Sequence, residues 1–270
     1  VDQLSYALKH RCFLPFFCLE RERLSDERAR DDQWRCAVAA GGDGTLLEVV
    51  NRANGLPITL LPLGNENLVA KYCGLIRSGI VLAETIADGK LYYADLASLN
   101  GRLFSVMVGA GLDADVVHRV HRRRRGHIGK QHYVVPTLQA LSYYRYPTID
   151  VEIDTGEVLR GSLVFVFNIP QYAMDLPIAM RAHPADGKLD VYVFERPGMF
   201  SLARYLWCVF RRRHLDLPDC HHRVTSKVLL RSDSPVPLQT DGDPAGALPA
   251  TVEVLPRALP LVIPRQGSVL

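Results

Sequence analysis

The run CAVAAGGDGTLLEVVNRA, residues 36–53, decides the fold of the N-terminal part of this 270-residue chain. Small and apolar residues enter a glycine-rich turn, and a helix-period pattern follows, which predicts a buried strand, a tight turn and a helix. The glycines permit positive φ and let a phosphate approach the backbone, while the first N–H groups of the helix carry partial positive charge. The run therefore predicts a phosphate site at Gly41, Gly42, Gly44 and Thr45. It is not a P-loop, because it contains no G-x-x-x-x-G-K-[ST].

Asp43 lies inside this turn. Beside phosphates, a carboxylate is useful for holding a metal ion or for accepting a proton. The alternative is a tight strand-to-helix turn in which Asp43 serves only as a cap. The residues alone leave both interpretations open.

A second strand-loop-helix run, PITLLPLGNEN at residues 57–67, follows one β-α unit later. The apolar residues before Gly64 predict a buried strand, and the helix after the loop ends at Gly74. Because the carboxyl ends of parallel strands share one edge of a sheet, two such loops form one cleft. Asn65 and Asn67 could bind a nucleotide there, although capping the helix is the commoner use of such residues.

The pattern changes near residues 90–95. Beyond that point, short alternating runs separated by turn signals are typical of a sandwich or barrel. Helical patterns interrupt these strands at 131–144 and 199–212. The sequence therefore predicts an α/β domain over residues 1–93 and a β-rich domain over residues 94–270.

Composition excludes several classes of protein. With 48% hydrophobic and 23% charged residues, the chain is neither a disordered tail nor a collagen-like fibre nor a heptad rod. No apolar run approaches the roughly 20 residues that a membrane-spanning helix needs, so any membrane contact is expected to be peripheral. Six scattered cysteines without a C-x-x-C pair favour a reducing, cytoplasmic compartment over a zinc site or a disulfide framework. No apolar leader precedes the body, and the start at Val1 suggests that an upstream segment is missing.

Charge is unevenly distributed, although the net charge is only +3. Residues 116–149 carry seven Lys and Arg and no acid, and four of these are the consecutive Arg122, Arg123, Arg124 and Arg125. Such a run indicates an anionic partner, and the alternative is a solvated helix end. We expect no nucleic-acid binding, because no aromatic reading surface accompanies the arginines.

Taken together with three later segments, the two loops resemble the diacylglycerol kinase catalytic domain family, which includes bacterial lipid kinases and sphingosine kinases. GGDGT is followed about twenty residues later by PLG-x-x-N. VGAGLDAD at 108–115 resembles the family's G-x-G-x-D-A segment, PADGKLD at 184–190 resembles its P-x-A-x-x-D-G-x-L-D stretch, and TDGD at 240–243 resembles its late D-G-E turn. The matches keep the family's order from about residue 36 onward.

The resemblance implies a fold of two domains with ATP held between them. The first is a Rossmann-like α/β nucleotide domain, and the second is an antiparallel β-sandwich. The glycines and Thr45 of the first loop would bind the nucleotide phosphates, together with Gly64, Asn65 and Asn67 of the second loop.

The resemblance also implies roles for three acids and an activity. Asp43 would lie at the reacting centre, Asp186 would support a Mg²⁺ site, and Asp243 would deprotonate the acceptor. Without the family, Asp186 and Asp243 are more ordinary as turn residues, since Asp-Gly is a common turn dipeptide. The implied activity is transfer of the γ-phosphoryl group of ATP to a lipid hydroxyl, with a diacylglycerol-like acceptor.

The chain also departs from the family pattern. Nothing before Gly41 matches the family's N-P-x-x-G strand and loop, so the first strand is either truncated or absent. Leu68 replaces an acid, Asn65 replaces a threonine, and residues 174–180 lack the usual glycines. Asp243 is one methylene shorter than the usual Glu, which reduces its reach by roughly 1.5 Å.

These departures favour one alternative, a kinase-fold protein that binds nucleotide or lipid without catalysis. A second alternative is an NAD kinase-like enzyme, because NAD kinases share the GGDG turn and a distant fold. The order of the segments weighs against that second alternative.

Two basic regions bear on membrane contact. The resemblance places the run from Arg122 to Arg125 near the family's lipid-facing surface, which implies peripheral attraction to an anionic membrane at its inner face. A second segment, residues 205–213, ends in three arginines, and its apolar stripe could enter a membrane interface. Burial in the core is the commoner fate of such a stripe. A homodimer is compatible with the sequence, which leaves the oligomeric state open.

Overall fold

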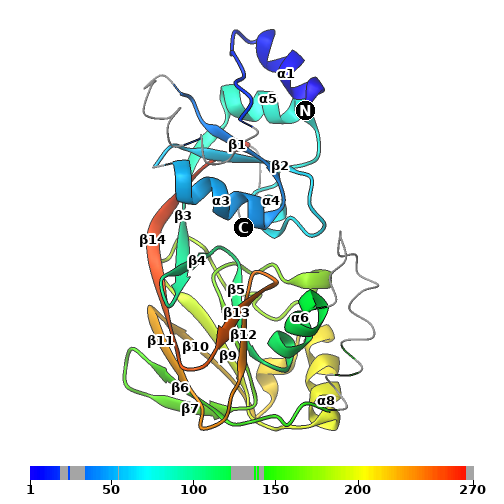
Figure 1. Cartoon of the computed structure of the whole chain (residues 1–270), viewed down its shortest axis with the longest axis vertical. Coiled ribbons are helices and arrows are strands. Elements are labelled where there is room, and N and C mark those ends of the chain that lie inside the picture. Colours follow the sequence, from blue (N-terminus) through cyan, green and yellow to red (C-terminus); the bar gives the residue numbers. More distant parts are fainter. Residues whose placement is uncertain are drawn as a thin grey trace. The chain divides into compact units, whose positions relative to one another are not determined.

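The chain divides into two compact units in the computed structural model (Figure 1). Unit 1 comprises Val1–Leu96 with Pro256–Leu270, and unit 2 comprises Ala97–Leu255. The strands β3 (Lys90–Leu99) and β14 (Ala250–Ile263) each contain a point of division. The residues that the structure describes are 1–18, 24, 34–53, 55–122, 137, 139 and 143–265.

Unit 1 is built on parallel strands. β1 (Ala37–Gly41) pairs parallel with β2 (Ile58–Pro62) along its whole length, and Leu261 of β14 pairs parallel with Ile58. Every residue of β2 is buried, as expected for a central parallel strand. The described helices of this unit are α1 (Asp2–Lys9), α3 (Asp43–Ala53), α4 (Leu68–Tyr72) and α5 (Gly79–Asp88).

Local sequence explains where these helices lie. The Ser78 hydroxyl accepts a hydrogen bond from the Val81 N–H at 3.4 Å and so caps α5. Helix α1 packs closely on α5, because a Cβ on Gly79 would lie 2.5 Å from the Leu4 nitrogen. Helix α3 packs against β1 and β2 directly after the glycine turn (Figure 1).

Unit 2 contains two sheets. In one, β11 (Lys227–Arg231) lies between β14 and β6 (Ile149–Ile153), with β7 (Val158–Gly161) beyond, and β4 (Arg102–Phe104) pairs with β3. The other has six antiparallel strands in the order β10-β9-β8-β5-β12-β13. Their bounds are Cys220–Thr225, Leu189–Phe194, Leu163–Phe167, Met107–Gly111, Pro237–Thr240 and Asp243–Ala247.

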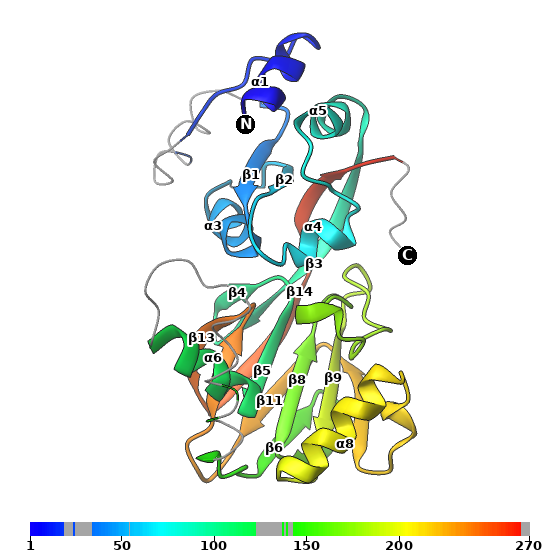
Figure 2. The ribbon, with the colours of Figure 1, turned by 90° about the vertical axis from the view of Figure 1, so that its right-hand side faces the viewer.

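The core of unit 2 lies between its two sheets. It is made of aliphatic side chains that are nearly all inaccessible, such as Val108, Val166, Val191 and Val228. Strands β5, β8 and β9 are buried on both faces. Helices α6 (Leu112–Arg122) and α8 (Met199–Phe210) cover part of the face of the six-stranded sheet that is turned away from the other sheet (Figure 2), and Tyr172 packs on Phe165 and Phe167 of the same face.

The predicted fold class, a Rossmann-like α/β unit followed by an antiparallel sandwich, is confirmed. The domain limits differ from the expected 1–93 and 94–270, because residue 93 falls within β3 and residues from Pro256 onward return to unit 1. The helix expected over 199–212 is α8, whereas most of 131–144 lies outside the described residues. None of the described helices is long and apolar enough to cross a membrane.

Candidate functional site

The first loop of unit 1 joins β1 to α3. The Gly42 carbonyl accepts hydrogen bonds from the Thr45 and Leu46 N–H groups at 3.0 and 3.1 Å and so starts the helix. A Cβ on Gly41 would lie 2.2 Å from the Thr45 hydroxyl oxygen, so this position must be glycine for Thr45 to fold back over the turn. A Cβ on Gly44 would meet nothing within 4 Å. The loop is therefore tight at Gly41 and open at Gly44.

The second loop packs directly on the first. The Leu63 N–H donates to the Gly41 carbonyl at 3.0 Å, and a Cβ on Gly64 would lie only 2.6 Å from the Gly42 Cα. This approach requires glycine at 64, whereas a Cβ on Gly42 would lie 3.4 Å from the Gly64 Cα, an ordinary contact. The two loops are in direct contact, as expected for loops that share one edge of the sheet.

Asn67 closes the second loop on itself. Its side-chain oxygen accepts from the Gly64 N–H at 2.9 Å, and its side-chain nitrogen donates to the Gly64 carbonyl at 2.8 Å. The Asn67 backbone is left-handed, with φ 50°, a conformation that Asn tolerates better than most residues. Asn67 thus shapes the loop with its side chain and makes no cap hydrogen bond at α4.

We expect Asn67→Ala to lower the stability of unit 1 by about 2 kcal/mol, because it removes both hydrogen bonds and places alanine in the left-handed region. Thermal melts measure this loss. Asn67→Gly is the matched variant, since glycine adopts the same φ without strain and should recover part of the loss. Equal melting temperatures for the two variants would contradict the assigned backbone strain.

Asp43 links the two loops through α4. Its carboxylate oxygens accept hydrogen bonds from the Leu68 and Val69 N–H groups at 2.9 and 3.1 Å. Burial raises the pKa of Asp43 above its usual value, and these two donors act in the opposite direction. Asp43 therefore caps a helix, as the alternative interpretation predicts. The helix that it caps is α4 and not α3, in which Asp43 itself lies. Its place at the reacting centre stays a prediction.

A pocket of about 300 Å³ opens beside the second loop. The residues that line it include Gly64, Asn65 and Asn67, together with the cationic Lys71 and Arg77. Glu66 lies 3.6 Å from the Lys71 ammonium. The lining holds two cations against one acid, Glu66, which suits an anionic ligand such as a nucleotide phosphate, and the volume is at the lower end for ligand pockets.

In unit 2, the turn TDGD folds around Asp241. Its two carboxylate oxygens accept from the N–H groups of Ser105, Val106 and Met107 and from the Ser105 hydroxyl, all at 2.8–2.9 Å. Burial raises the pKa of Asp241 to about 6, and these hydrogen bonds oppose the rise. Asp241 thus ties the start of β5 to the end of β12.

Asp113 lies nearby at the start of α6. It accepts hydrogen bonds from the Tyr172 hydroxyl and from the Gln239 amide, both at 2.7 Å, and burial raises its pKa. A Cβ on Gly109 would lie 2.5 Å from the Asp113 carboxylate, which explains a glycine there. The Gln239 oxygen in turn accepts from the Gly242 N–H at 2.9 Å. A continuous hydrogen-bonded chain therefore supports the turn that carries Asp243.

Asp243 itself is exposed. One of its carboxylate oxygens lies 3.2 Å from His121 Nε2, the other lies 3.9 Å from the Arg102 guanidinium, and 52% of its side chain is accessible. A carboxylate that is held in place by neighbours and open to solvent can meet an incoming hydroxyl. The structure supports its accessibility, and its role as the base stays a prediction.

The remaining predicted positions receive less support. Asp186 is exposed and accepts from the Lys188 N–H at 2.9 Å, which is an ordinary turn contact. Among the residues that the structure describes, no group of three or more His, Cys, Asp or Glu could hold a metal ion. Arg122 is exposed at the end of α6, and residues 123–125 lie outside the described part of the chain.

Sequence reasoning missed the polar residues that support the turn. These residues are Asp241, which the resemblance includes only as part of TDGD, and Tyr172, Gln239 and His121, to which no motif gives a role. No sequence signal identifies them, because each meets its partner across a long separation in the chain.

Two protein-family models match successive parts of this chain. Residues 20–99 match the family model "Diacylglycerol kinase catalytic domain", and residues 106–263 match "YegS C-terminal NAD kinase beta sandwich-like domain". The diacylglycerol kinase of Bacillus subtilis (strain 168) is 24% identical over 86% of this chain and 78% of its own. That of Mycobacterium tuberculosis (strain ATCC 25618 / H37Rv) is 27% identical over 85% and 77%.

A solved structure shows the same fold. The crystal structure of a diacylglycerol kinase from Bacillus anthracis str. Sterne superposes with a TM-score of 0.67 at 14% identity, covering 98% of this chain and 92% of that one. The two family models together span both units in the expected order. The chain therefore belongs to the diacylglycerol kinase family and is a phosphotransferase with an alcohol group as acceptor.

Proposed function

We propose that this protein transfers the γ-phosphoryl group of ATP to the hydroxyl of a diacylglycerol-like lipid, with Mg²⁺ accompanying the nucleotide. The match of both family models, in order along one chain, carries the proposal. The glycine loops and the cationic pocket of unit 1 suit the phosphates, and Asp243 suits the acceptor hydroxyl.

The chemistry needs few protein groups. The acceptor oxygen attacks the γ-phosphorus, the bond to the β-phosphate oxygen breaks, ADP leaves, and Asp243 takes the hydroxyl proton. Lys71 and Arg77 offset charge on the phosphates in unit 1. Mg²⁺ would be held mainly by the nucleotide phosphates, as is usual for this ion, with Asp186 supporting the site.

We expect Asp243→Asn to lower kcat by roughly 10²–10⁴-fold, the usual contribution of a positioned base, with little change in melting temperature. Turnover of ATP with Mg²⁺ is measured on mixed micelles that contain diacylglycerol, sphingosine or other lipid alcohols, or with soluble NAD. Asp243→Glu restores the missing methylene and should keep activity. Asp150→Asn, which changes an exposed acid paired with Arg160 at 2.8 Å, is the matched control and should have no effect.

Two outcomes would contradict the proposal. ATP binding without turnover on any acceptor would indicate the non-catalytic binding protein. Turnover with NAD alone would indicate the NAD kinase-like alternative.

If ATP bound without turnover, replacing Leu68 by Asp would not simply restore the acid of the family pattern. The Leu68 side chain is buried at the start of α4, so a carboxylate there would be buried too.

A further inference from the structure

Helix α8 is apolar on both of its faces although it lies on the surface of unit 2. Its sequence is MFSLARYLWCVF, and Tyr205 and Val209 face inward, each 3% exposed. Large apolar side chains also face outward: Phe200 is 88% exposed, Trp207 65% and Phe210 61%. A surface helix normally carries polar residues on its outer side, so this face is unusual. The outer face of α8 comprises Met199, Phe200, Leu206, Trp207 and Phe210.

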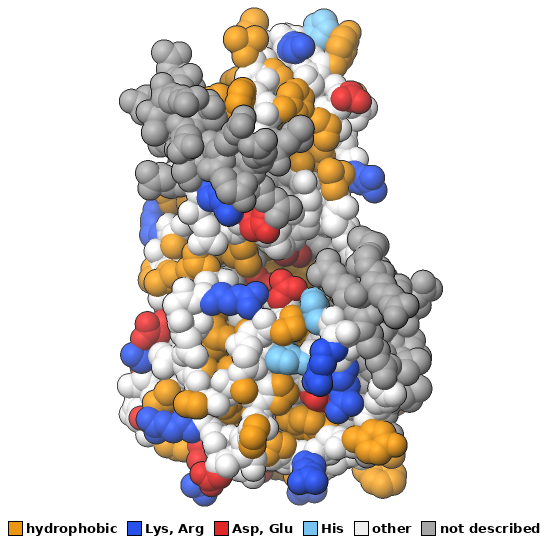
Figure 3. Space-filling view, in the orientation of Figure 1, with side chains coloured by type: hydrophobic (Ala, Val, Ile, Leu, Met, Phe, Trp, Pro, Cys, Tyr) orange, Lys and Arg blue, Asp and Glu red, His pale blue; other side chains and the backbone are white. Residues whose placement is uncertain are grey.

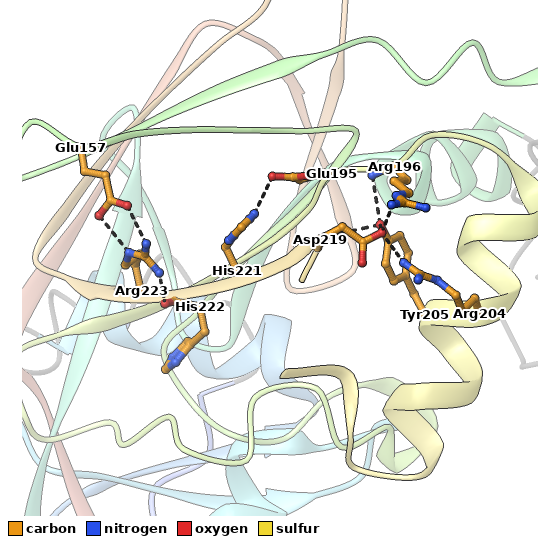
Figure 4. A network of polar contacts seen from close by, with 9 residues as sticks. All are labelled: Glu157, Glu195, Arg196, Arg204, Tyr205, Asp219, His221, His222 and Arg223. Atoms are coloured by element: carbon orange, nitrogen blue, oxygen red, sulfur yellow. Dashed lines mark hydrogen bonds and ion pairs between the residues drawn. The ribbon is translucent and has the colours of Figure 1, made fainter. Parts of the chain in front are cut away.

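The inner face is fixed to the sheet by a polar cluster. Asp219, which precedes β10, accepts a hydrogen bond from the Tyr205 hydroxyl at 2.9 Å and pairs with Arg204 and with Arg196 (Figure 4). Only 4% of the Asp219 side chain is exposed. The Tyr205 ring also packs on Phe194, with ring centroids 4.8 Å apart. The helix therefore cannot rotate to bury its outer face without breaking these contacts.

Cations continue the outer face at the end of the helix. Arg211, Arg212 and Arg213 follow α8 directly, all exposed, and residues 196–215 contain no acid. The Arg211 guanidinium lies 5.5 Å from the centre of the Trp207 ring. Figure 3 shows exposed hydrophobic side chains at its lower right, where Figure 1 places one end of α8.

A pocket of about 260 Å³ lies at this end of the helix. Its lining includes Trp207, Arg211 and Arg213, together with Asp216, whose carboxylate lies 3.0 Å from Arg213. The pocket thus has an aromatic wall and a cationic rim. An acidic headgroup fits such a rim while acyl chains meet the neighbouring apolar side chains.

We propose that the outer face of α8, with Arg211, Arg212 and Arg213, is the surface by which this protein docks on an anionic lipid bilayer. Aromatic residues beside arginines are typical of the bilayer interface, where rings enter the headgroup layer and cations meet acidic lipids. A second copy of the chain fits less well, because α8 contributes no acid to meet the partner's arginines. The proposal rests on the proposed function only in that the acceptor is a membrane lipid.

Tryptophan fluorescence tests the contact directly. The chain has two tryptophans, so Trp34→Phe leaves Trp207 as the only one. We expect its emission to shift to the blue with vesicles containing about 30% phosphatidylglycerol, and brominated acyl chains to quench it. Vesicles of phosphatidylcholine alone should give a smaller shift. No shift and no quenching on the anionic vesicles would overturn the proposal.

Vesicle flotation compares the binding of variants that change the apolar or the cationic part of this surface. Phe200→Ser with Trp207→Ser and Phe210→Ser, and separately Arg211→Glu with Arg212→Glu, should each weaken binding by about tenfold or more. The matched controls change side chains exposed elsewhere on unit 2: Val158→Ser with Val224→Ser, and Arg160→Glu. These controls should float like the parent protein, and all variants should melt as it does.

Other outcomes would also overturn the docking surface. Binding that is lost only when the arginines at 122–125 are changed would move the contact to that run. A dimer that the serine variants dissociate, without any vesicle binding, would assign the face to a second copy of the chain. Flotation needs neither ATP nor turnover. A protein that floats through α8 but phosphorylates no lipid would therefore keep this inference and lose the proposed function.

Discussion

Asp241→Asn lowers the free energy of unfolding of unit 2 by about 2–3 kcal/mol, the expected cost of leaving enclosed donors without an acceptor. One Asp241 oxygen accepts from the Ser105 N–H and hydroxyl, and the other accepts from the Val106 and Met107 N–H groups. An amide presents N–H groups at one of these places. The Ser105 hydroxyl can rotate and accept, but at least one backbone N–H then faces another donor.

Backbone strain does not contribute to this expected loss of stability. Asp241 is left-handed, with φ 49°, and Asn adopts that conformation as readily as Asp. The melting temperature should fall by roughly 5–10 °C, at about 2–4 °C per kcal/mol for a protein of this size. Asp243→Asn, two residues away and exposed, should change stability by less than about 1 kcal/mol. Equal melting temperatures for the two variants would show that the Asp241 hydrogen bonds contribute nothing net.

Gly64→Ala is expected to raise the KM for ATP and to lower kcat/KM by about 100-fold, because small displacements of a binding loop have large effects on rate. The new methyl group would lie 2.6 Å from the Gly42 Cα and 2.9 Å from the Asn67 side-chain oxygen. The first of these atoms is backbone and cannot move aside alone. The two loops must separate, which also costs about 1–3 kcal/mol of stability. Initial rates at varied ATP and thermal melts measure both effects.

Gly44→Ala provides the stability control for that experiment. A methyl group there meets nothing within 4 Å, and Gly44 lies in the first turn of α3, where alanine is the better helix former. Its melting temperature should therefore stay the same or rise slightly. A Gly64→Ala protein with the parent melting temperature and KM would show that the close approach of the loops is not required.

The glycine loops of unit 1 could be predicted because their signals are local. An apolar strand, glycines and a helical pattern follow one another within residues 36–53, and short spacing fixes how they fold. The direct contact of Gly42 with Gly64 follows from two parallel neighbouring strands. The two hydrogen bonds from α4 to Asp43 could not be predicted, because they join residues 25 and 26 positions apart through the packing of a whole helix.

The geometry of the late turn, TDGD, could not be predicted from the sequence. Asp241 and Asp243 are chemically identical, and the sequence does not indicate which carboxylate turns toward β5; in the structure Asp241 and Gly242 are both left-handed, and the Asp241 carboxylate turns inward. Residues 174–180 are similar. They lack the family's glycines, yet Met174 and Asp175 adopt φ of 57° and 53°. The sequence shows only that the glycines are missing there, and it does not predict a backbone conformation that usually favours glycine.

The route of β14 has a consequence for how the protein is made. Leu261 completes the parallel sheet of unit 1 against Ile58, about 200 residues after that strand leaves the ribosome. Everything in unit 2 is synthesised between the two. Domains usually fold in the order in which they emerge, but here the second unit can finish first while the first waits for its last strand. A chain truncated after residue 255 and released from the ribosome should therefore contain a protease-resistant unit 2 joined to a protease-sensitive N-terminal segment.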